Sequence, residues 1–333
     1  MKQFFLALAL SSGVPFAANA AVIDNGVIQL GVDRLGQLNV DGDVPSPVTG
    51  TTAVGLRYLP SGFEATSHGC LCEGWGVGIG ETGQSGYANN SLGISGLTLV
   101  SFTSTASTAA SIVSVNGTGL VVTHSFAPAS ETVNLYRVNV KIENTGMIDI
   151  SDLRYTRTFD WDVEPTTFNE YVTHAGVATT PSVLRADNNG FSDSNPFGFR
   201  STIGAGGLGD FADLGPLDHG SNFDFGFGGL KTGEAYTFDI FYGAAGSKAS
   251  ALAALGSVGA ELYSLGQSVN AAGRPADDMT TFIFAFKGVG GEVIVPPPPA
   301  PIPLPATAFM LLAGIGMISS FRLRRNKLQV MRS

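Results

Sequence analysis

The sequence predicts an all-β fold: an antiparallel β-sandwich ectodomain with one late helix, followed by a C-terminal transmembrane helix. Short segments in which apolar and polar residues alternate recur along the chain, and turn residues separate them. No internal repeat of roughly 20–50 residues is visible, which argues against a solenoid or a propeller. An apolar segment near the C-terminus predicts the membrane helix.

The first half of the ectodomain supplies a series of short strands. The clearest alternation places Tyr136, Val138, Val140 and Ile142 on one face of a strand. Asn116 and Gly117 suit the tight turn of a hairpin, because both can adopt positive φ. We expect strands at 23–32, 38–40, 54–59, 97–103, 111–115, 120–126 and 135–143.

Two segments lack clear periodicity. Residues 61–97 are rich in glycine, and we expect a packed irregular loop or a twisted ribbon there, with Trp75 as its apolar anchor. Residues 185–230 are rich in Gly, Asn, Asp and Phe and read as long loops. Between them, residues 153–163 alternate as a strand that Pro165 ends.

The last part of the ectodomain combines two strands with the helix. Strands are expected at 236–242 and 280–287, and the helix at 247–265 between them. Ser247 can cap the helix, and Gly266 suits its C-terminal exit. The apolar stripe of the helix consists of Leu252, Leu255, Val258 and Leu262.

Both ends of the chain carry targeting features. Residues 1–20 read as a signal peptide, with cleavage between Ala20 and Ala21 after the Ala18-Asn19-Ala20 motif. The ectodomain at 21–292 precedes a proline-rich spacer at 293–305, a transmembrane helix at 306–323 and a basic cytoplasmic tail at 324–333. Four basic residues act as the stop-transfer signal: Arg322, Arg324, Arg325 and Lys327.

The C-terminal segment resembles a known sorting signal. The motif consists of Ile302, Pro303, Leu304, Pro305 and Ala306. Together with the apolar helix and the arginine cluster, it resembles the PEP-CTERM type of sorting domain, and in particular the variant built on Val-Pro-Leu-Pro-Ala. The resemblance implies that an exosortase-like membrane enzyme cleaves the chain near the motif. A plain membrane anchor is the alternative.

The ectodomain resembles an uncharacterised group of exported bacterial proteins with such tails. The resemblance includes the segments Gly69–Gly76, Asp160–Pro165 and Phe282–Gly290. No activity comes with it. Between residues 21 and 292, 12 basic residues face 27 acidic ones, a net charge near −15 that argues against nucleic acid as a partner.

Acidic residues are the first candidates for a site. Asp160, Asp162 and Glu164 recur at every second position, so all three fall on one face of a strand. They suit calcium ligands or the acid and base of a glycosidase, and the alternative is an exposed acidic face of an edge strand. Asp187, Asn189 and Asp193 offer further oxygens for calcium, or they form Asx turns.

The two cysteines, Cys70 and Cys72, leave two alternatives open. Export favours a disulfide, whereas a ring that spans one intervening residue disfavours it. A metal site with His68 and Glu73 lacks the second cysteine pair that zinc sites use. No metal site is therefore predicted from these residues, and calcium is the one cofactor considered.

These features predict an exported protein of the cell envelope, cell surface or extracellular matrix, with a structural or adhesive role. Gly-x-Ser-x-Gly and His-Glu-x-x-His do not occur in the chain, so an enzyme is not expected. One alternative is a glycan-binding module, either with or without a requirement for calcium, with Trp75 or Trp161 as a sugar platform and exopolysaccharide as the partner. The other is a secreted carbohydrate-active hydrolase.

Overall fold

The computed structural model describes residues 20–295. These residues form 21 strands and one helix, and every recorded strand pair is antiparallel, which confirms the all-β prediction. Residues 1–19 of the predicted signal peptide, the sorting motif, the predicted membrane helix and the basic tail lie outside the described residues. Within residues 20–295, no helix is both long enough and apolar enough to cross a membrane.

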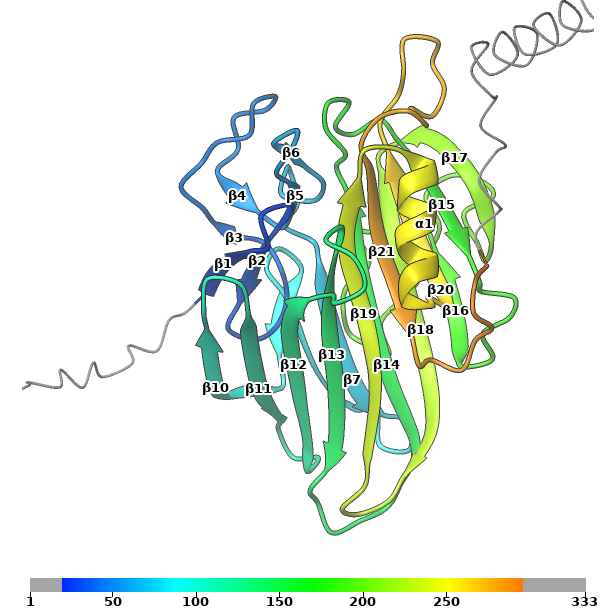
Figure 1. The fold of residues 1–333 in the computed structure, drawn as a ribbon. Coiled ribbons are helices and arrows are strands. Elements are labelled where there is room, and N and C mark those ends of the chain that lie inside the picture. The colour runs from blue at the N-terminus through cyan, green and yellow to red at the C-terminus, as the bar shows by residue number, and fades with distance from the viewer. Residues whose placement is uncertain (1–19, 296–333) are drawn as a thin grey trace, which may run out of the picture. The chain divides into compact units, whose positions relative to one another are not determined.

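The larger sheet has nine strands, with β10 at one edge and β17 at the other (Figure 1). The hairpin predicted around Asn116 is confirmed, since β11 pairs with β12 across that turn. In order across the sheet, the strands are β10 (Leu97–Ser104), β11 (Ala109–Val115), β12 (Leu120–Pro128), β13 (Leu135–Asn144), β19 (Ala235–Ala245), β21 (Thr281–Lys287), β20 (Leu262–Gln267), β15 (Glu170–Ala175) and β17 (Phe211–Leu217).

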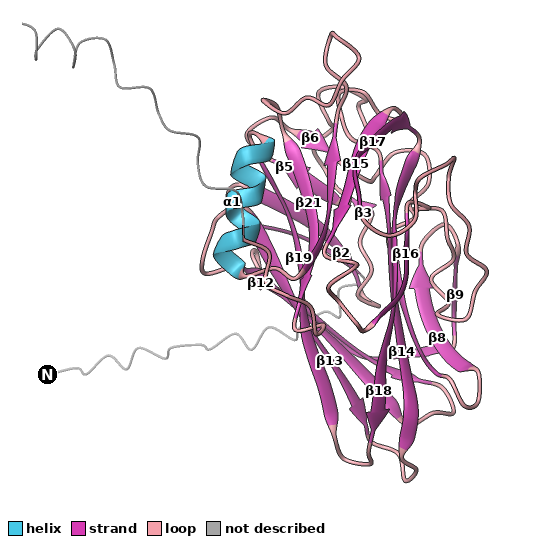
Figure 2. Ribbon diagram, turned by 90° about the vertical axis from the view of Figure 1, so that its right-hand side faces the viewer, coloured by secondary structure: helices cyan, strands magenta, loops and turns pink. Residues whose placement is uncertain are grey.

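The second sheet has six strands, and Figure 2 shows several of them, with β8 and β9 toward one edge. Its strands in order are β16 (Val183–Asp187), β18 (His219–Leu230), β14 (Ile150–Trp161), β7 (Gly74–Ile79), β8 (Gln84–Asn89) and β9 (Gly93–Ser95). Shorter strands near the N-terminus are β1 (Ala20–Asp24), β2 (Ile28–Asp33), β3 (Val40–Asp41), β4 (Ala53–Val54), β5 (Leu56–Tyr58) and β6 (Phe63–Glu64).

Aromatic side chains join the two large sheets. Phe159 of β14 stacks on Phe284 of β21 with ring centroids 5.3 Å apart, and Phe223 of β18 meets Phe286 at 5.4 Å. Trp75 and Trp161 are fully buried in the same core. Such ring pairs add about 0.5–1.5 kcal/mol each beyond the area that they bury. The alternation of Phe and Tyr along these strands therefore holds the sheets face to face.

The helix α1 (Lys248–Val258) covers the outer face of the nine-stranded sheet, near β20 and β21 (Figure 1). Its predicted start is confirmed, because the Ser247 hydroxyl accepts a hydrogen bond from the Ser250 amide. Its predicted end at residue 265 is wrong. Gly259 adopts a left-handed conformation that ends the helix, and Leu262–Gln267 continues as β20 between β21 and β15. The hydrogen bonds that β20 forms with the strands on both of its sides outweigh the helical spacing of Leu255, Val258 and Leu262.

The prediction of long loops across residues 185–230 is correct for residues 188–210, which contain no strand, and wrong for the rest. The segment contains part of β16 and all of β17 and β18, and β18 pairs with both β14 and β16. Residues 61–97 also contain regular strands, since β7, β8 and β9 lie within them. The prediction of Trp75 as their apolar anchor is confirmed, because its ring is fully buried and its indole N–H donates to the Leu35 carbonyl.

Candidate functional site

The three predicted acidic residues lie at or just beyond the end of β14, an interior strand of the six-stranded sheet with β18 on one side and β7 on the other. The pairing with β7 ends at Thr158, before these residues, whereas Asp160 pairs with Gly220 of β18. Asp160 is within the strand, and Asp162 and Glu164 follow its last residue. All three side chains are buried. The alternative of an exposed acidic face on an edge strand is therefore wrong, because β14 has neighbours on both sides and the polypeptide covers these carboxyl groups.

Glu164 is held by a hydrogen-bond network. Its carboxylate accepts bonds from the Ser46 hydroxyl, the Thr49 hydroxyl at 2.7 Å, His68 Nε2 at 3.0 Å and the Glu64 amide at 2.9 Å. Burial opposes ionisation of Glu164, but the bonds from His68, Ser46 and Thr49 outweigh it and lower its pKa to about 2. Glu164 is thus a structural carboxylate with its oxygens already engaged.

Asp160 and Asp162 have the opposite environment. Neither oxygen of either carboxyl group has a hydrogen-bond partner, and each side chain is only 1% exposed. Burial raises the pKa of Asp160 well above its ordinary value, and the nearby Asp218 raises it further. Burial, followed by the charge of Asp160, raises the pKa of Asp162 to about 10. Burial without hydrogen-bond partners thus favours the protonated form of both carboxyl groups.

Glu170, at the start of β15, belongs to the same group and was missed from the sequence. One of its oxygens accepts the His219 amide at 2.9 Å, and the other has no partner. Burial, with the charges of Asp160 and Asp218, raises its pKa to about 10. The alternation of acidic residues stops at Glu164, so the sequence pattern does not include Glu170. Its position five residues after Pro165 was the one sequence feature that placed it near these acids.

The second group of predicted calcium ligands forms turns. The Asp187 carboxylate accepts Arg185 Nε at 2.6 Å and the Asn189 amide at 3.1 Å. Asn189 and Asp193 accept the amides of Phe191 and Asn195. These contacts are those of Asx turns, the alternative that the sequence left open. The turns bring Gly190 against Asp160: a Cβ at Gly190 would lie 2.9 Å from Asp160 Oδ1.

Cys70 and Cys72 lie beside Asp160. Their sulfur atoms are in contact with each other, as a disulfide requires, and Cys72 is fully buried. One ligand atom from each of Cys70, Cys72 and Asp160 lies within 4.8 Å of the other two. Among residues 20–295 this is the one group of three or more His, Cys, Asp or Glu side chains that meets this separation. The structure does not gather the acidic residues predicted for calcium into such a group.

The two other residues considered for a metal have different partners. His68 bonds to Glu164 and Thr49, and Glu73 pairs with Arg157. The sugar platform predicted at Trp75 or Trp161 is wrong, because both rings lie in the core between the sheets.

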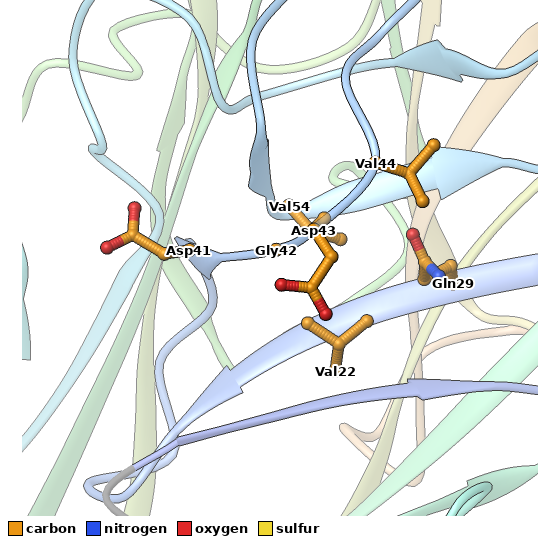
Figure 3. Close-up of a pocket in the computed structure, with 7 residues that line it drawn as sticks. All are labelled: Val22, Gln29, Asp41, Gly42, Asp43, Val44 and Val54. Atoms are coloured by element: carbon orange, nitrogen blue, oxygen red, sulfur yellow. The ribbon is translucent and has the colours of Figure 1, made fainter.

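A pocket of about 300 Å³ lies between the small N-terminal strands. In Figure 3, Asp43 extends toward Val22, whereas Asp41 points away from the other labelled residues. Gln29 and Val44 complete the lining beside them. Two further pockets lie beside strands β10 to β12 and beside the edge strand β16. Asp160, Asp162 and Glu170 line none of these three pockets.

Comparison with known proteins adds little. No protein-family model matches the chain, and no curated protein matches it. Among solved structures, the chain is similar to the crystal structure of a putative aldose 1-epimerase from Escherichia coli K12, with 10% sequence identity and a TM-score of 0.29. The match covers 83% of this chain and 92% of that one. At this TM-score the likeness carries no argument about fold or function.

Proposed function

We propose that this protein is an exported structural protein of the cell surface or extracellular matrix that self-associates through the edge of its larger sheet. The observation that carries the proposal is the edge strand β10, which bears no charged residue and no proline. The proposed export and envelope location derive from the signal peptide and sorting motif expected at the two ends of the chain.

The backbone of β10 is available for pairing. The strand pairs with β11 on one side, and no strand within residues 20–295 pairs with its other side. An open strand edge presents unpaired N–H and C=O groups, to which a strand of another chain can add. Val100, at the centre of β10, is 60% exposed. Val100 lies in a bulge between Leu99 and Ser101, where the pairing with β11 shifts by one residue. The residues on either side of the bulge remain paired with β11.

Charge distribution distinguishes this edge from the rest of the molecule. No Asp, Glu, Lys or Arg occurs from Thr82 to Ser130, a range that includes β9 and β10. The ectodomain as a whole carries a charge near −15, so two copies repel each other over most of their surfaces. The edge formed by β10 allows close approach with the least repulsion between like charges.

The strands β17 and β16 carry charges or proline, which β10 lacks. In the larger sheet, β17 contains Asp213 and Pro216, and Asp213 forms an ion pair with Lys248. In the smaller sheet, β16 contains Arg185 and Asp187, which bond to each other. Charges and proline on edge strands prevent pairing between molecules. The fold therefore protects the edges formed by β17 and β16. Of the two remaining edges of these sheets, β10 has eight residues and β9 only three, which favours an antiparallel contact between two copies of β10.

The oligomeric state of the full-length protein in detergent tests this proposal. We expect sedimentation equilibrium to show a concentration-dependent dimer, and Val100→Lys to weaken dimerisation at least tenfold. Val133→Lys is the matched control, because Val133 is 62% exposed and lies between β12 and β13 rather than on the edge. A wild-type protein that stays monomeric at all concentrations, or equal loss in both variants, would overturn the proposal.

Processing at the C-terminus is tested separately, by the intact mass of the protein isolated from its native cells. A mass that ends near Pro305 or Ala306 supports cleavage by an exosortase-like enzyme. A mass that includes Ser333 instead identifies the helix as a permanent anchor.

Glycan binding is a second candidate, and the pocket of Figure 3 favours it. Carboxylate and amide groups such as those of Asp43 and Gln29 can bond to sugar hydroxyl groups. We expect Asp43→Ala to reduce retention on immobilised exopolysaccharide if this function is correct, whereas Asp239→Ala, on β19, leaves it unchanged. Retention that excess EDTA does not alter would exclude the calcium-dependent form.

A further inference from the structure

We propose that Cys70, Cys72 and Asp160 form a zinc-binding site when the two cysteines are reduced. The three residues come from distant parts of the sequence: the cysteines precede β7, and Asp160 lies near the end of β14. The fold thus supplies the additional ligand that the Cys-x-Cys sequence lacks.

The geometry suits a tetrahedral ion. Thiolate and carboxylate ligands at about 2.0–2.3 Å from zinc stand roughly 3.3–3.8 Å from one another. In the structure the two sulfur atoms are bonded to each other, and one Asp160 oxygen lies within 4.8 Å of both. Reduction must therefore let the sulfurs move apart before all three atoms reach these separations. Three protein ligands leave a fourth position for water or for a further carboxyl group.

Asp160 provides independent support, because its burial is otherwise unexplained. A carboxyl group with two unpartnered oxygens and 1% exposure costs free energy, and buried polar groups in folded proteins normally have partners. Asp162 is equally buried, and its two carboxyl oxygens also lack partners. A divalent cation compensates such a group directly, since coordination replaces the missing hydrogen bonds.

The chemistry of the donors selects the metal. Two thiolates favour zinc over calcium and magnesium, which prefer sets made entirely of oxygen. The neighbouring acid Glu164 does not compete, because its oxygens already accept hydrogen bonds from Ser46, Thr49 and His68.

Metal binding and the disulfide exclude each other. Formation of the disulfide from two thiols releases two protons and passes two electrons to an oxidant, such as a small-molecule disulfide that is reduced to two thiols. The oxidised sulfurs then no longer act as thiolate ligands. The site therefore binds zinc in the reduced protein and loses it on oxidation.

Metal titration of the full-length protein in detergent tests the site. After reduction and removal of metal, we expect one Zn²⁺ per chain, measured by competition with a chromophoric chelator. Co²⁺ in place of Zn²⁺ should give a sulfur-to-cobalt charge-transfer band. Oxidation with a small-molecule disulfide should abolish both signals.

Three variants separate a specific site from weak surface binding. Asp160→Asn should raise the Kd for zinc at least tenfold while retaining the charge-transfer band at saturating Co²⁺. Cys72→Ser should weaken that band as well. Asp152→Asn, which removes an acid paired with Arg154 on the same strand, should bind like the wild type. If the reduced wild type binds no stoichiometric zinc, or if Asp160→Asn binds as tightly as Asp152→Asn, the proposal is wrong.

Discussion

Arg157 and Glu73 form an ion pair that is fully enclosed by the core. Arg157 Nε lies 2.5 Å from Glu73 Oε1, and neither side chain is exposed to solvent. Glu73 also accepts the Tyr242 hydroxyl at 2.8 Å and the Leu38 amide at 2.6 Å. The pair therefore joins β14 and the residue before β7 to β19 of the other sheet and to Leu38 of the N-terminal segment.

Removal of one partner should destabilise the protein strongly. We expect Glu73→Ala to lower the free energy of unfolding by about 3–5 kcal/mol, because Arg157 is then a buried charge without compensation. Urea unfolding measures this change. Glu143→Ala, which breaks the exposed pair with Lys141, should cost less than about 1 kcal/mol. Similar losses in both variants would show that the buried pair has no special role.

Asp162 should make the protein less stable as the pH rises. Its pKa in the folded state is about 10, against an ordinary value of 3.8, so between these values the unfolded chain ionises and the folded protein does not. Stability is therefore lost with rising pH, by up to about 1.4 kcal/mol per pH unit from this group. Asp162→Asn should remove that loss and make the variant more stable than the wild type at pH 8.

Urea unfolding at pH 5 and pH 8, with chelator and under oxidising conditions, tests the prediction for Asp162. Asp152→Asn serves as the control, because Asp152 is partly exposed and paired with Arg154. The prediction is contradicted if the free energy of unfolding changes between pH 5 and pH 8 in the same way for the wild type and for Asp162→Asn.

The parts of the fold that the sequence predicts well are strands with one apolar face. Tyr136, Val138, Val140 and Ile142 are all buried, and β13 extends through them as expected. The strand β18 was missed because glycine and polar residues interrupt it. Its signal was present in the alternation of Phe223, Phe225 and Phe227, of which Phe223 and Phe225 face β21 in the aromatic core.

Glycines in β7 conceal a strand for a related reason. A Cβ at Gly76 would lie 1.9 Å from the Ser194 carbonyl oxygen, so only glycine allows the segment after β16 to lie over this strand. Local sequence cannot show which distant segment will approach so closely. The same limit applies to the candidate site, because β-strand spacing predicted that Asp160, Asp162 and Glu164 act together. The structure instead separates Glu164 from them and adds Glu170.

Glu164 should stabilise the fold at neutral pH and lose this effect in acid. Its pKa is about 2 in the folded protein against an ordinary value of 4.5, so its contribution is complete above pH 4.5 and falls as the pH drops toward 2. Glu164→Gln should cost about 1.5–3 kcal/mol at pH 7, the range for hydrogen bonds to a charged group, and much less at pH 3. Glu143→Gln should show no such pH dependence, because its carboxylate is partly exposed and makes one ion pair. Thermal unfolding of both variants across this pH range measures the difference. A constant cost for Glu164→Gln would mean that shape, rather than the charge on Glu164, holds the Ser46, Thr49 and His68 side chains in place.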